Sequence, residues 1–262
     1  MILDLYQIDA FTDKVFSGNP ACVVPLTEWL PDELLLQITR ENAVAETAFF
    51  IRGKEKISLR WFTPEIEMDL CGHATLATAH ALKEILAYPK NKMVFSTASG
   101  DLHVTAKDGL YTMEFPSRKP VPASLPAAIA RSLSQQPKAV LKARDYVLVY
   151  DKETDISSIQ VDRQELDRIN LDPGGVIVTA PGLHCDFVSR FFTPQASILE
   201  DPVTGSAHCS LIPYWAEQLD KTDMLAFQLS ERGGKLLCKD KGERVFISGN
   251  ARTYSVGVLH TE

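Results

Sequence analysis

The sequence predicts two α+β domains of one design, each with a central apolar helix, and three observations support this fold class. The segment Arg-Trp-Phe-Thr-Pro at 60–64 recurs as Arg-Phe-Phe-Thr-Pro at 190–194, and the offset of 190 − 60 = 130 residues is almost half of the 262-residue chain. Each copy is followed by a short acidic connection and then by a glycine, Gly72 or Gly205, that opens an apolar segment. Strand patterns also outnumber helix patterns in both halves. A repeat of this length is too long for a solenoid, so we infer an internal duplication.

Local patterns give the order of elements in the first half. Alternation of apolar and polar residues predicts a strand over 2–9, and Ser17-Gly18-Asn19-Pro20 is typical of a turn because Gly and Asn tolerate left-handed angles. Pro31 with two acids after it predicts a helix that ends near residue 42. The segment 72–86 is apolar nearly all round, which predicts a helix buried on all sides. Further strands are expected over 21–25, 46–51, 57–63, 93–97, 101–107 and 110–115.

Prolines near the midpoint predict a linker over 117–123, so that the domains are 1–118 and 119–262, with a final strand free to cross between them. Ser124 is the expected N-cap of a helix that runs to about residue 135. Pro213 predicts a kink or a broken turn in the second apolar helix. Other expected elements are helices over 164–169 and 205–219, a turn at 172–175, and strands over 138–143, 146–150, 176–180, 187–192, 224–229, 235–239, 243–247 and 253–259.

Composition is that of an ordinary soluble globular protein, with 45% apolar and 23% charged residues. The net charge of −7 argues against a nucleic-acid or anionic-membrane surface, although not against a small anionic substrate. No signal-peptide pattern opens the chain and no apolar run approaches the roughly 20 residues of a membrane span, so we expect a cytoplasmic protein. Five scattered cysteines without a C-x-x-C pair are typical of reduced thiols rather than of a disulfide framework or a zinc site.

The starts of the two apolar helices predict a site for a small anion. Free N–H groups and the positive end of the helix dipole favour a carboxylate at Gly72 and at Gly205. His73 and Ser206 follow these glycines at equivalent positions, and Asp201 lies four residues before the second one. With a pseudo-twofold axis, the two helix starts would face each other across a cleft. The plainer alternative stays open: the glycines only start helices, Ser206 caps one of them, and Asp201 is favoured by the helix dipole.

Glu46 is the candidate acid/base residue. It opens an apolar, β-prone run in which a carboxylate has little structural reason to be present. A closed apolar cleft would favour its protonated form, which suits a group that both takes and returns a proton. Solvent exposure at a strand edge is the alternative.

Cys71 is expected to be a packing residue or a bystander. A cofactor-free racemase needs one acid/base group on each face of the carbon atom, and the counterpart of Cys71 in the second half is Thr204. The two-thiol arrangement is therefore absent.

Other signatures are missing from the sequence. There is no P-loop, no dinucleotide-binding glycine pattern and no hydrolase nucleophile elbow. His73, His80 and Asp69 do not form a recognisable metal triad, so we expect no cofactor and no metal. His80 and His208 are single histidines within apolar helices and are expected to be structural.

At these residues the chain resembles the PhzF family of phenazine-biosynthesis-like isomerases over its whole length. The segments that carry the resemblance are Ser17-Gly18-Asn19-Pro20-Ala21, Ala45-Glu46-Thr47-Ala48-Phe49, Leu70-Cys71-Gly72-His73-Ala74-Thr75 and Glu200-Asp201-Pro202-Val203-Thr204-Gly205-Ser206-Ala207. The resemblance implies a fold similar to that of diaminopimelate epimerase, in which each of two domains is a β-barrel wrapped around a central helix and the active site lies between the domains. It also implies a homodimer.

The resemblance implies roles for the candidate residues, with Glu46 as the proton-transferring group. The residues that would bind the substrate are His73, Asp201, Ser206 and the backbone amides near Gly72 and Gly205. We therefore expect a cofactor-independent isomerase that moves a proton on a small carboxylate-bearing metabolite. Two alternatives stay open: a racemase or epimerase that uses Cys71 with another group, and a non-catalytic protein that binds a small acid.

Overall fold

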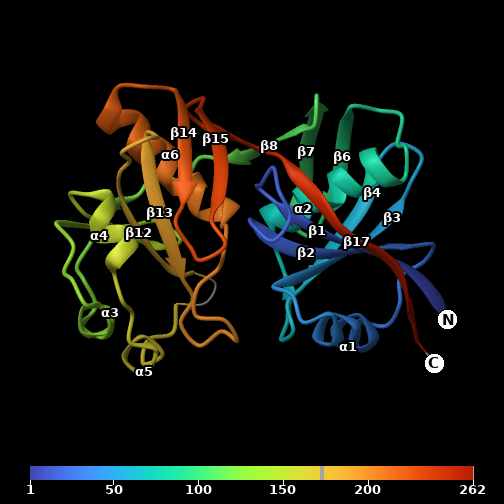
Figure 1. The fold of residues 1–262 in the computed structure, drawn as a ribbon, viewed down its shortest axis with the longest axis horizontal. Helices are drawn as coiled ribbons and strands as arrows, with labels where there is room; N and C mark the ends of the chain where they lie inside the picture. Colours follow the sequence, from blue (N-terminus) through green and yellow to red (C-terminus); the bar gives the residue numbers. More distant parts are fainter. Residues whose placement is uncertain (172–173, 262) are drawn as a thin grey trace. The chain divides into compact units, whose positions relative to one another are not determined.

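The computed structural model describes residues 1–171 and 174–261, and the chain divides into two compact units. Unit 1 comprises Met1–Glu114 and Ile247–Glu262, and unit 2 comprises Phe115–Phe246 (Figure 1). The chain thus leaves unit 1 within strand β8 (Leu110–Pro116) and returns within β16 (Arg244–Gly249). Asp172 and Pro173, half of an expected turn, lie outside the described residues.

Unit 1 is built on a mixed sheet whose pairing alternates in direction. β1 pairs with β2 antiparallel, β2 with β3 parallel, β3 with β4 antiparallel, β4 with β6 parallel, and β6 with β7 antiparallel. The C-terminal strand β17 lies alongside β1 in antiparallel register (Figure 1). The strands are β1 (Ile2–Ala10), β2 (Asn19–Leu26), β3 (Glu46–Arg52), β4 (Ile57–Phe62), β5 (Glu67–Met68), β6 (Lys92–Thr97), β7 (Gly100–Lys107) and β17 (Ala251–His260).

The helix α2 (Gly72–His80) is the centre of unit 1. All nine of its residues are buried, and it packs against β1, β2, β3, β7 and β17. The expected burial on all sides is confirmed. The helix does not continue in α form to residue 86, because a π-helical turn, η1 (Ala81–Ile85), follows it and Leu86 N donates to Ala81 O five residues earlier. A second helix, α1 (Asp32–Asn42), packs its apolar face on β2, β3 and β4.

Unit 2 repeats the same order of pairing. β10 pairs with β11 antiparallel, β11 with β12 parallel, β12 with β13 antiparallel, β13 with β14 parallel, and β14 with β15 antiparallel. The short strand β9 extends the sheet beside β10. The strands are β9 (Val121–Pro122), β10 (Ala139–Lys142), β11 (Tyr146–Val149), β12 (Val176–Pro181), β13 (Phe187–Phe192), β14 (Asp223–Gln228) and β15 (Gly234–Asp240).

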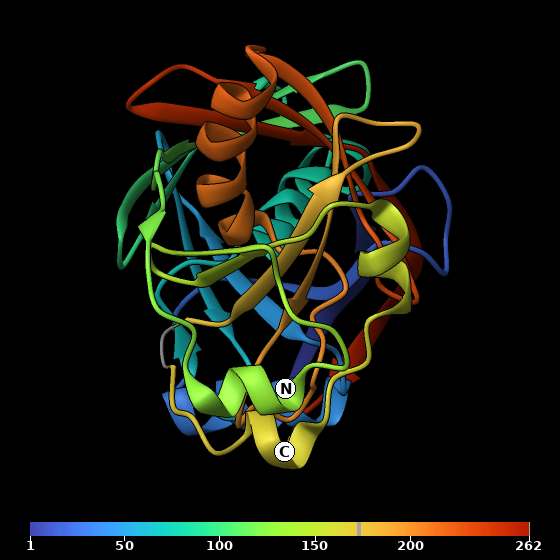
Figure 2. The ribbon, with the colours of Figure 1, turned by 90° about the vertical axis from the view of Figure 1, so that its left-hand side faces the viewer.

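The helices of unit 2 differ from two expectations. The helix expected from Ser124 is only α3 (Ala127–Ser132), because Pro126 takes the N-cap position. The helix α6 (Gly205–Leu219) contains Pro213 and yet continues without a break (Figure 2), so of the expected kink or broken turn the broken turn is wrong. Proline lacks the N–H that would bond to Cys209 O, and Arg118 N donates to this carbonyl instead, at 2.9 Å. Two short helices, α4 (Glu153–Ser158) and α5 (Arg163–Leu166), precede β12.

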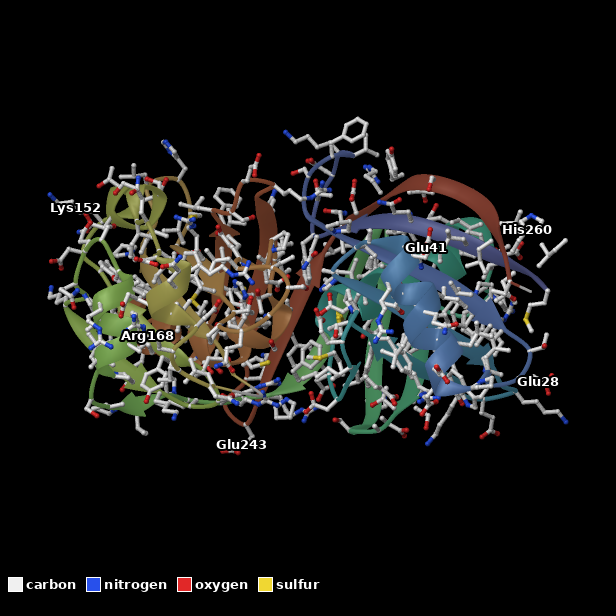
Figure 3. The ribbon with its side chains drawn as sticks, turned by 90° about the horizontal axis from the view of Figure 1, so that it is seen from below. Glu28, Glu41, Lys152, Arg168, Glu243 and His260 are labelled. Atoms are coloured by element: carbon white, nitrogen blue, oxygen red, sulfur yellow. The ribbon has the colours of Figure 1, made fainter. Side chains whose placement is uncertain are left out.

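Charged side chains lie on the surface of each unit (Figure 3). The labelled side chains are all exposed: Glu28, Glu41, Lys152, Arg168, Glu243 and His260. Among the described residues, the helices lack the length and apolar character needed to cross a membrane.

Candidate active site

Glu46 is the first residue of β3, where the chain enters the sheet from α1. Ala43, in the left-handed conformation at φ 52°, ends the helix and turns the chain toward β3. Glu46 then pairs with Ala21 in the parallel ladder between β2 and β3. Its side chain is only 15% exposed, so the carboxylate lies largely within the protein.

The turn before β2 places Asn19 against His73. Gly18 has a φ of +70°, and a Cβ atom there would lie 2.2 Å from Ala10 O, so the backbone needs glycine at this position. Asn19 follows as the first, fully buried residue of β2, and its Nδ2 lies 3.2 Å from His73 Nδ1. The expected turn is therefore also part of the support of a candidate site residue.

His73 connects Glu46 with Cys71. As the second residue of α2, it is buried, with Nε2 3.1 Å from Glu46 Oε2 and Nδ1 3.6 Å from Cys71 Sγ. The contact with Glu46 has the distance of an ion pair. Apart from this contact, Glu46 Oε2 and His73 Nε2 are buried atoms without a hydrogen-bond partner within the described part of the chain. Such atoms are costly in a folded protein, and they are typical of a site that a ligand completes.

The protonation of this group follows from burial and neighbouring charge. Burial acts to lower the pKa of His73, but Cys71 and the Glu46 carboxylate outweigh it, so that this pKa lies well above its ordinary value. The pKa of Cys71 is raised, first by burial and then by the negative charge of Glu46. Neighbouring negative charge thus favours the protonated form of the His73 imidazole, and burial favours the neutral form of the Cys71 thiol.

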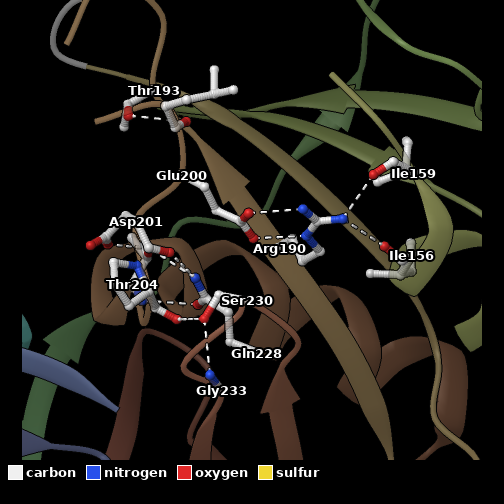
Figure 4. A network of polar contacts seen from close by, with 12 residues as sticks. Ile156, Ile159, Arg190, Thr193, Glu200, Asp201, Thr204, Gln228, Ser230 and Gly233 are labelled. Carbon is white, nitrogen blue, oxygen red and sulfur yellow. Dashed lines mark hydrogen bonds and ion pairs between the residues drawn. The ribbon is translucent and has the colours of Figure 1, made fainter. Parts of the chain in front are cut away.

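In unit 2, Asp201 lies in a turn fixed by hydrogen bonds just before α6 (Figure 4). Its backbone N donates to Phe191 O at 3.0 Å, and the Thr204 hydroxyl donates to its carboxylate. Thr204 is the N-cap residue of α6, but its side chain makes no capping hydrogen bond. Cys71, the N-cap residue of α2, makes none either.

Gln228 is a residue of this turn that the sequence did not indicate. It ends β14, is 1% exposed, and donates from Nε2 to Asp201 O at 2.8 Å and to Thr204 Oγ1 at 3.2 Å (Figure 4). Its Oε1 accepts from Thr204 N at 2.9 Å. One buried amide thus holds both ends of the turn 201–204. A single glutamine at the end of a strand carries no signal for this role, whereas Asn19 lies in a segment with turn chemistry.

The remaining candidates are placed as follows within their own units. Gly72 and Gly205 are the first residues of α2 and α6, and Ser206 is half-buried in the first turn of α6. His80 is bonded through Nε2 to Thr253 Oγ1 at 2.9 Å, and His208 through Nδ1 to Thr204 O at 2.8 Å. Burial lowers the pKa of both of these histidines to about 4.

Comparison with known proteins shows similarity over the whole chain. A family model described as phenazine biosynthesis-like protein, PhzC-PhzF, matches residues 8–257. An uncharacterized isomerase of Pseudomonas aeruginosa is 46% identical over 260 residues, which cover 99% of this chain and 100% of that protein. The crystal structure of a phenazine biosynthesis protein of the PhzF family from Enterococcus faecalis is similar with a TM-score of 0.94 at 42% identity, over 100% of both chains.

A more distant likeness concerns the fold alone. A hydroxyproline epimerase from Agrobacterium vitis has a TM-score of 0.65 at 10% identity, over 98% of this chain and 92% of that chain. Together with the mixed sheets and the buried helix α2, these likenesses confirm the expected α+β, epimerase-like fold class.

Proposed function

Because the chain belongs to the phenazine biosynthesis-like (PhzC-PhzF) family, we propose that it is an isomerase that moves a proton on a small carboxylate-bearing metabolite, without a cofactor, through Glu46. The observation that carries this proposal is the 3.1 Å contact between His73, which is buried, and Glu46, which is largely buried. Apart from each other, their facing atoms have no hydrogen-bond partner among the described residues. The name of the Pseudomonas aeruginosa relative supports the reaction class.

In the proposed reaction, Glu46 transfers the proton and His73 stabilises the charge. The Glu46 carboxylate accepts a proton from a carbon atom next to a carbonyl or an unsaturated bond. The protonated His73 ring, 3.1 Å from Glu46 Oε2, stabilises the negative charge that develops on the substrate. Glu46 then returns the proton to another carbon atom. One base on one side of the substrate implies suprafacial transfer and rearrangement.

The same proposal assigns substrate binding to the first turns of the helices α2 and α6. The backbone amides at Gly72 and at Gly205 suit a carboxylate, since neither N-cap side chain bonds to the helix start. Ser206 and Asp201 add a hydroxyl and a carboxylate that can bond to polar substrate groups. The hydrogen bonds from Gln228 keep the Asp201 turn in one conformation without a ligand.

One observation favours a second candidate, a racemase or epimerase that uses Cys71. The thiol is not an isolated packing group, because its sulfur lies 3.6 Å from His73 Nδ1. A two-base reaction would exchange the hydrogen at one carbon atom and invert its configuration, whereas the Glu46 reaction moves the hydrogen to another position.

The test is proton NMR in D₂O with a panel of small cyclic and unsaturated carboxylic acids. Wild type is compared with Glu46→Gln, and Glu243→Gln serves as the matched control at an exposed position. We expect exchange or isomerisation of a panel compound, a loss of about 100-fold or more in Glu46→Gln, and no change in the control. Exchange that survives in Glu46→Gln and is lost in Cys71→Ala would assign the reaction to the thiol. Saturable binding of an acid without any exchange would contradict the enzyme and support a binding protein.

A further inference from the structure

The residues Glu46, Cys71 and His73 also have the chemistry of a metal site. They offer a carboxylate oxygen, a thiolate sulfur and an imidazole nitrogen, the three ligand types that Zn²⁺ takes from proteins. One ligand atom from each residue lies within 4.8 Å of the other two. Chain spacing does not indicate this set, because Glu46 belongs to β3 and the other two residues to the start of α2.

Two distances in the group, each measured from a different nitrogen of the His73 ring, are singly close to the separation between two ligands of one zinc ion. Zinc bonds of about 2.0–2.3 Å in a tetrahedral arrangement separate neighbouring ligand atoms by roughly 3.3–3.6 Å. Here His73 Nε2 lies 3.1 Å from Glu46 Oε2, and His73 Nδ1 lies 3.6 Å from Cys71 Sγ. A single ion uses one nitrogen of the His73 ring, so the third ligand has to move inward from within 4.8 Å.

A second, independent observation points to a ligand at this place. Glu46 Oε2 and His73 Nε2 are inaccessible to water and, apart from their 3.1 Å contact with each other, lack a hydrogen-bond partner in the described part of the chain. The His73 side chain is 4% exposed. A cation bound between the two atoms would satisfy both of them at once, whereas water has no access to either atom in the ligand-free arrangement.

We propose that Glu46, Cys71 and His73 form a binding site for Zn²⁺ in the protein without substrate. The ion replaces the proton of the Cys71 thiol and the proton on the His73 nitrogen that binds it, and both protons leave to solvent. The Glu46 carboxylate is the third ligand. The fourth position is left to water or to a small anion. Nitrogen and sulfur ligands select Zn²⁺ over Mg²⁺ and Ca²⁺, which prefer oxygen.

Binding of the ion would inhibit the enzyme, and this consequence alone depends on the proposed function. The positive charge of a bound ion makes the Glu46 carboxylate a weaker base toward a substrate C–H group, and a metal-bound His73 has lost the proton of its coordinating nitrogen. Zinc and substrate would therefore exclude each other.

The direct test is a titration of the full-length protein with Co²⁺, a spectroscopic substitute for Zn²⁺. We expect a sulfur-to-cobalt charge-transfer band that saturates at one ion per chain, disappears on addition of Zn²⁺ and is absent in Cys71→Ser. A chelator competition should show Zn²⁺ binding weakened by about tenfold or more in His73→Asn and in Glu46→Gln. Circular dichroism of each variant checks that it is folded.

The matched control removes the partly exposed thiol of Cys185 and the exposed neighbouring ring of His184, the pair most open to adventitious metal. The double variant His184→Asn/Cys185→Ser is expected to keep the band and the affinity. A band that survives in Cys71→Ser, that is lost in the control, or that never forms would overturn the proposal. The D₂O exchange assay reports the isomerase separately, so loss of metal binding with intact exchange refutes only the zinc site, and the reverse result refutes only the isomerase.

Discussion

At the scale of single residues, Gly18 shows how a position without a side chain supports the candidate site. Gly18 has a positive φ, and its backbone lies so near Ala10 O that a Cβ atom would clash there. The next residue, Asn19, starts β2 with its amide against the His73 ring. The support of His73 therefore depends on a backbone conformation that only glycine adopts at no cost.

We predict that Gly18→Ala destabilises the protein by about 2–4 kcal/mol, because strain at positive φ adds to the clash with Ala10 O. Gly109→Ala is the matched control, since Gly109 has a similar φ of +76° and nothing within 4 Å of an added Cβ atom. The control should cost only about 1 kcal/mol. Urea unfolding measures both values, and equal costs would contradict the role given to the clash.

Buried histidines predict a pH dependence of stability. The pKa of His208 is lowered by burial to about 4, from an ordinary value of 6.5. The folded protein therefore favours the neutral ring, whose contribution is complete above pH 6.5 and is lost as the pH falls through this window toward 4. The loss from His208 is on the order of 3 kcal/mol.

The variant His208→Asn should keep a donor for Thr204 O and remove this part of the pH dependence. Denaturant unfolding between pH 4 and pH 7 measures the effect, and His103→Asn, at an exposed position, is the control. The prediction fails if His208→Asn and wild type lose the same free energy of unfolding between pH 6.5 and pH 4.

Residue types in a motif were sufficient to predict Glu46 and His73 as candidates, but not the contacts that support them. Glu46 at a strand start and His73 at a helix start could be picked out as candidates from their own segments. Asn19 and Gln228 could not, because their contacts with His73 and Asp201 join parts of the chain that are far apart in sequence. Cys71, expected to be a packing residue or a bystander, lies with its sulfur 3.6 Å from His73 Nδ1, a contact that its repeat position could not indicate.

At the scale of elements, the two Phe-Thr-Pro segments make corresponding contacts. Arg60 binds Glu67 with both Nε and Nη2, at 2.7 Å each, and its guanidinium lies 5.0 Å from the centre of the Phe62 ring. Arg190 binds Glu200 at 2.7 and 2.8 Å, and lies 5.0 Å from the centre of the Phe192 ring. These equal contacts support the duplication, which stays a prediction about the origin of the chain.

We predict that Arg190→Met costs about 3 kcal/mol of stability and Arg60→Met only about 1 kcal/mol. Arg190 also donates to the carbonyl groups of Ile156 and Ile159 at the end of α4, and both would lose a partner together with Glu200. The second partner of Arg60 is instead Asp32, whose side chain is 67% exposed and which water can solvate. Thermal unfolding of both variants measures the two losses of stability. A larger loss of stability in Arg60→Met than in Arg190→Met would refute the argument.

Pro213 shows why the continuity of a single helix could not be predicted from its own sequence. Local rules predict that a proline inside a helix leaves a carbonyl without its donor, and Cys209 O does lose that donor. The donor that replaces it, Arg118 N, is 91 residues away in the sequence (209 − 118 = 91). Rules that use only neighbouring residues cannot predict such a contact. The helix therefore stays continuous where its sequence alone predicts a kink or a broken turn.

At the scale of the whole molecule, the α+β class and one central apolar helix in each half were predictable, since both follow from periodicity over many residues. The alternating order of antiparallel and parallel pairs was not, because pairing joins strands that are far apart in the chain. The assignment of 247–262 to unit 1 also depends on such pairing, in this case between the two ends of the chain.

The final prediction concerns this closing strand. Every residue of β1 has a partner in β17, from Ile2 with His260 to Ala10 with Ala251, and Thr253 of β17 bonds to the buried His80 of α2. Deletion of residues 251–262 should therefore expose an edge of β1 with unpaired backbone groups and leave His80 Nε2 without a partner. We expect the truncated protein to unfold or aggregate through unit 1.

Limited proteolysis with mass spectrometry distinguishes this result from general unfolding. Early cleavage sites are expected within 1–114, while unit 2 keeps its resistance because the core formed by α3–α5 and β11–β13 contains no residue of β17. Deletion of residues 261–262 alone is the control and should leave the thermal midpoint nearly unchanged. A protein lacking 251–262 with the wild-type midpoint and the wild-type cleavage pattern would show that β1 and α2 hold unit 1 together without the returning strand.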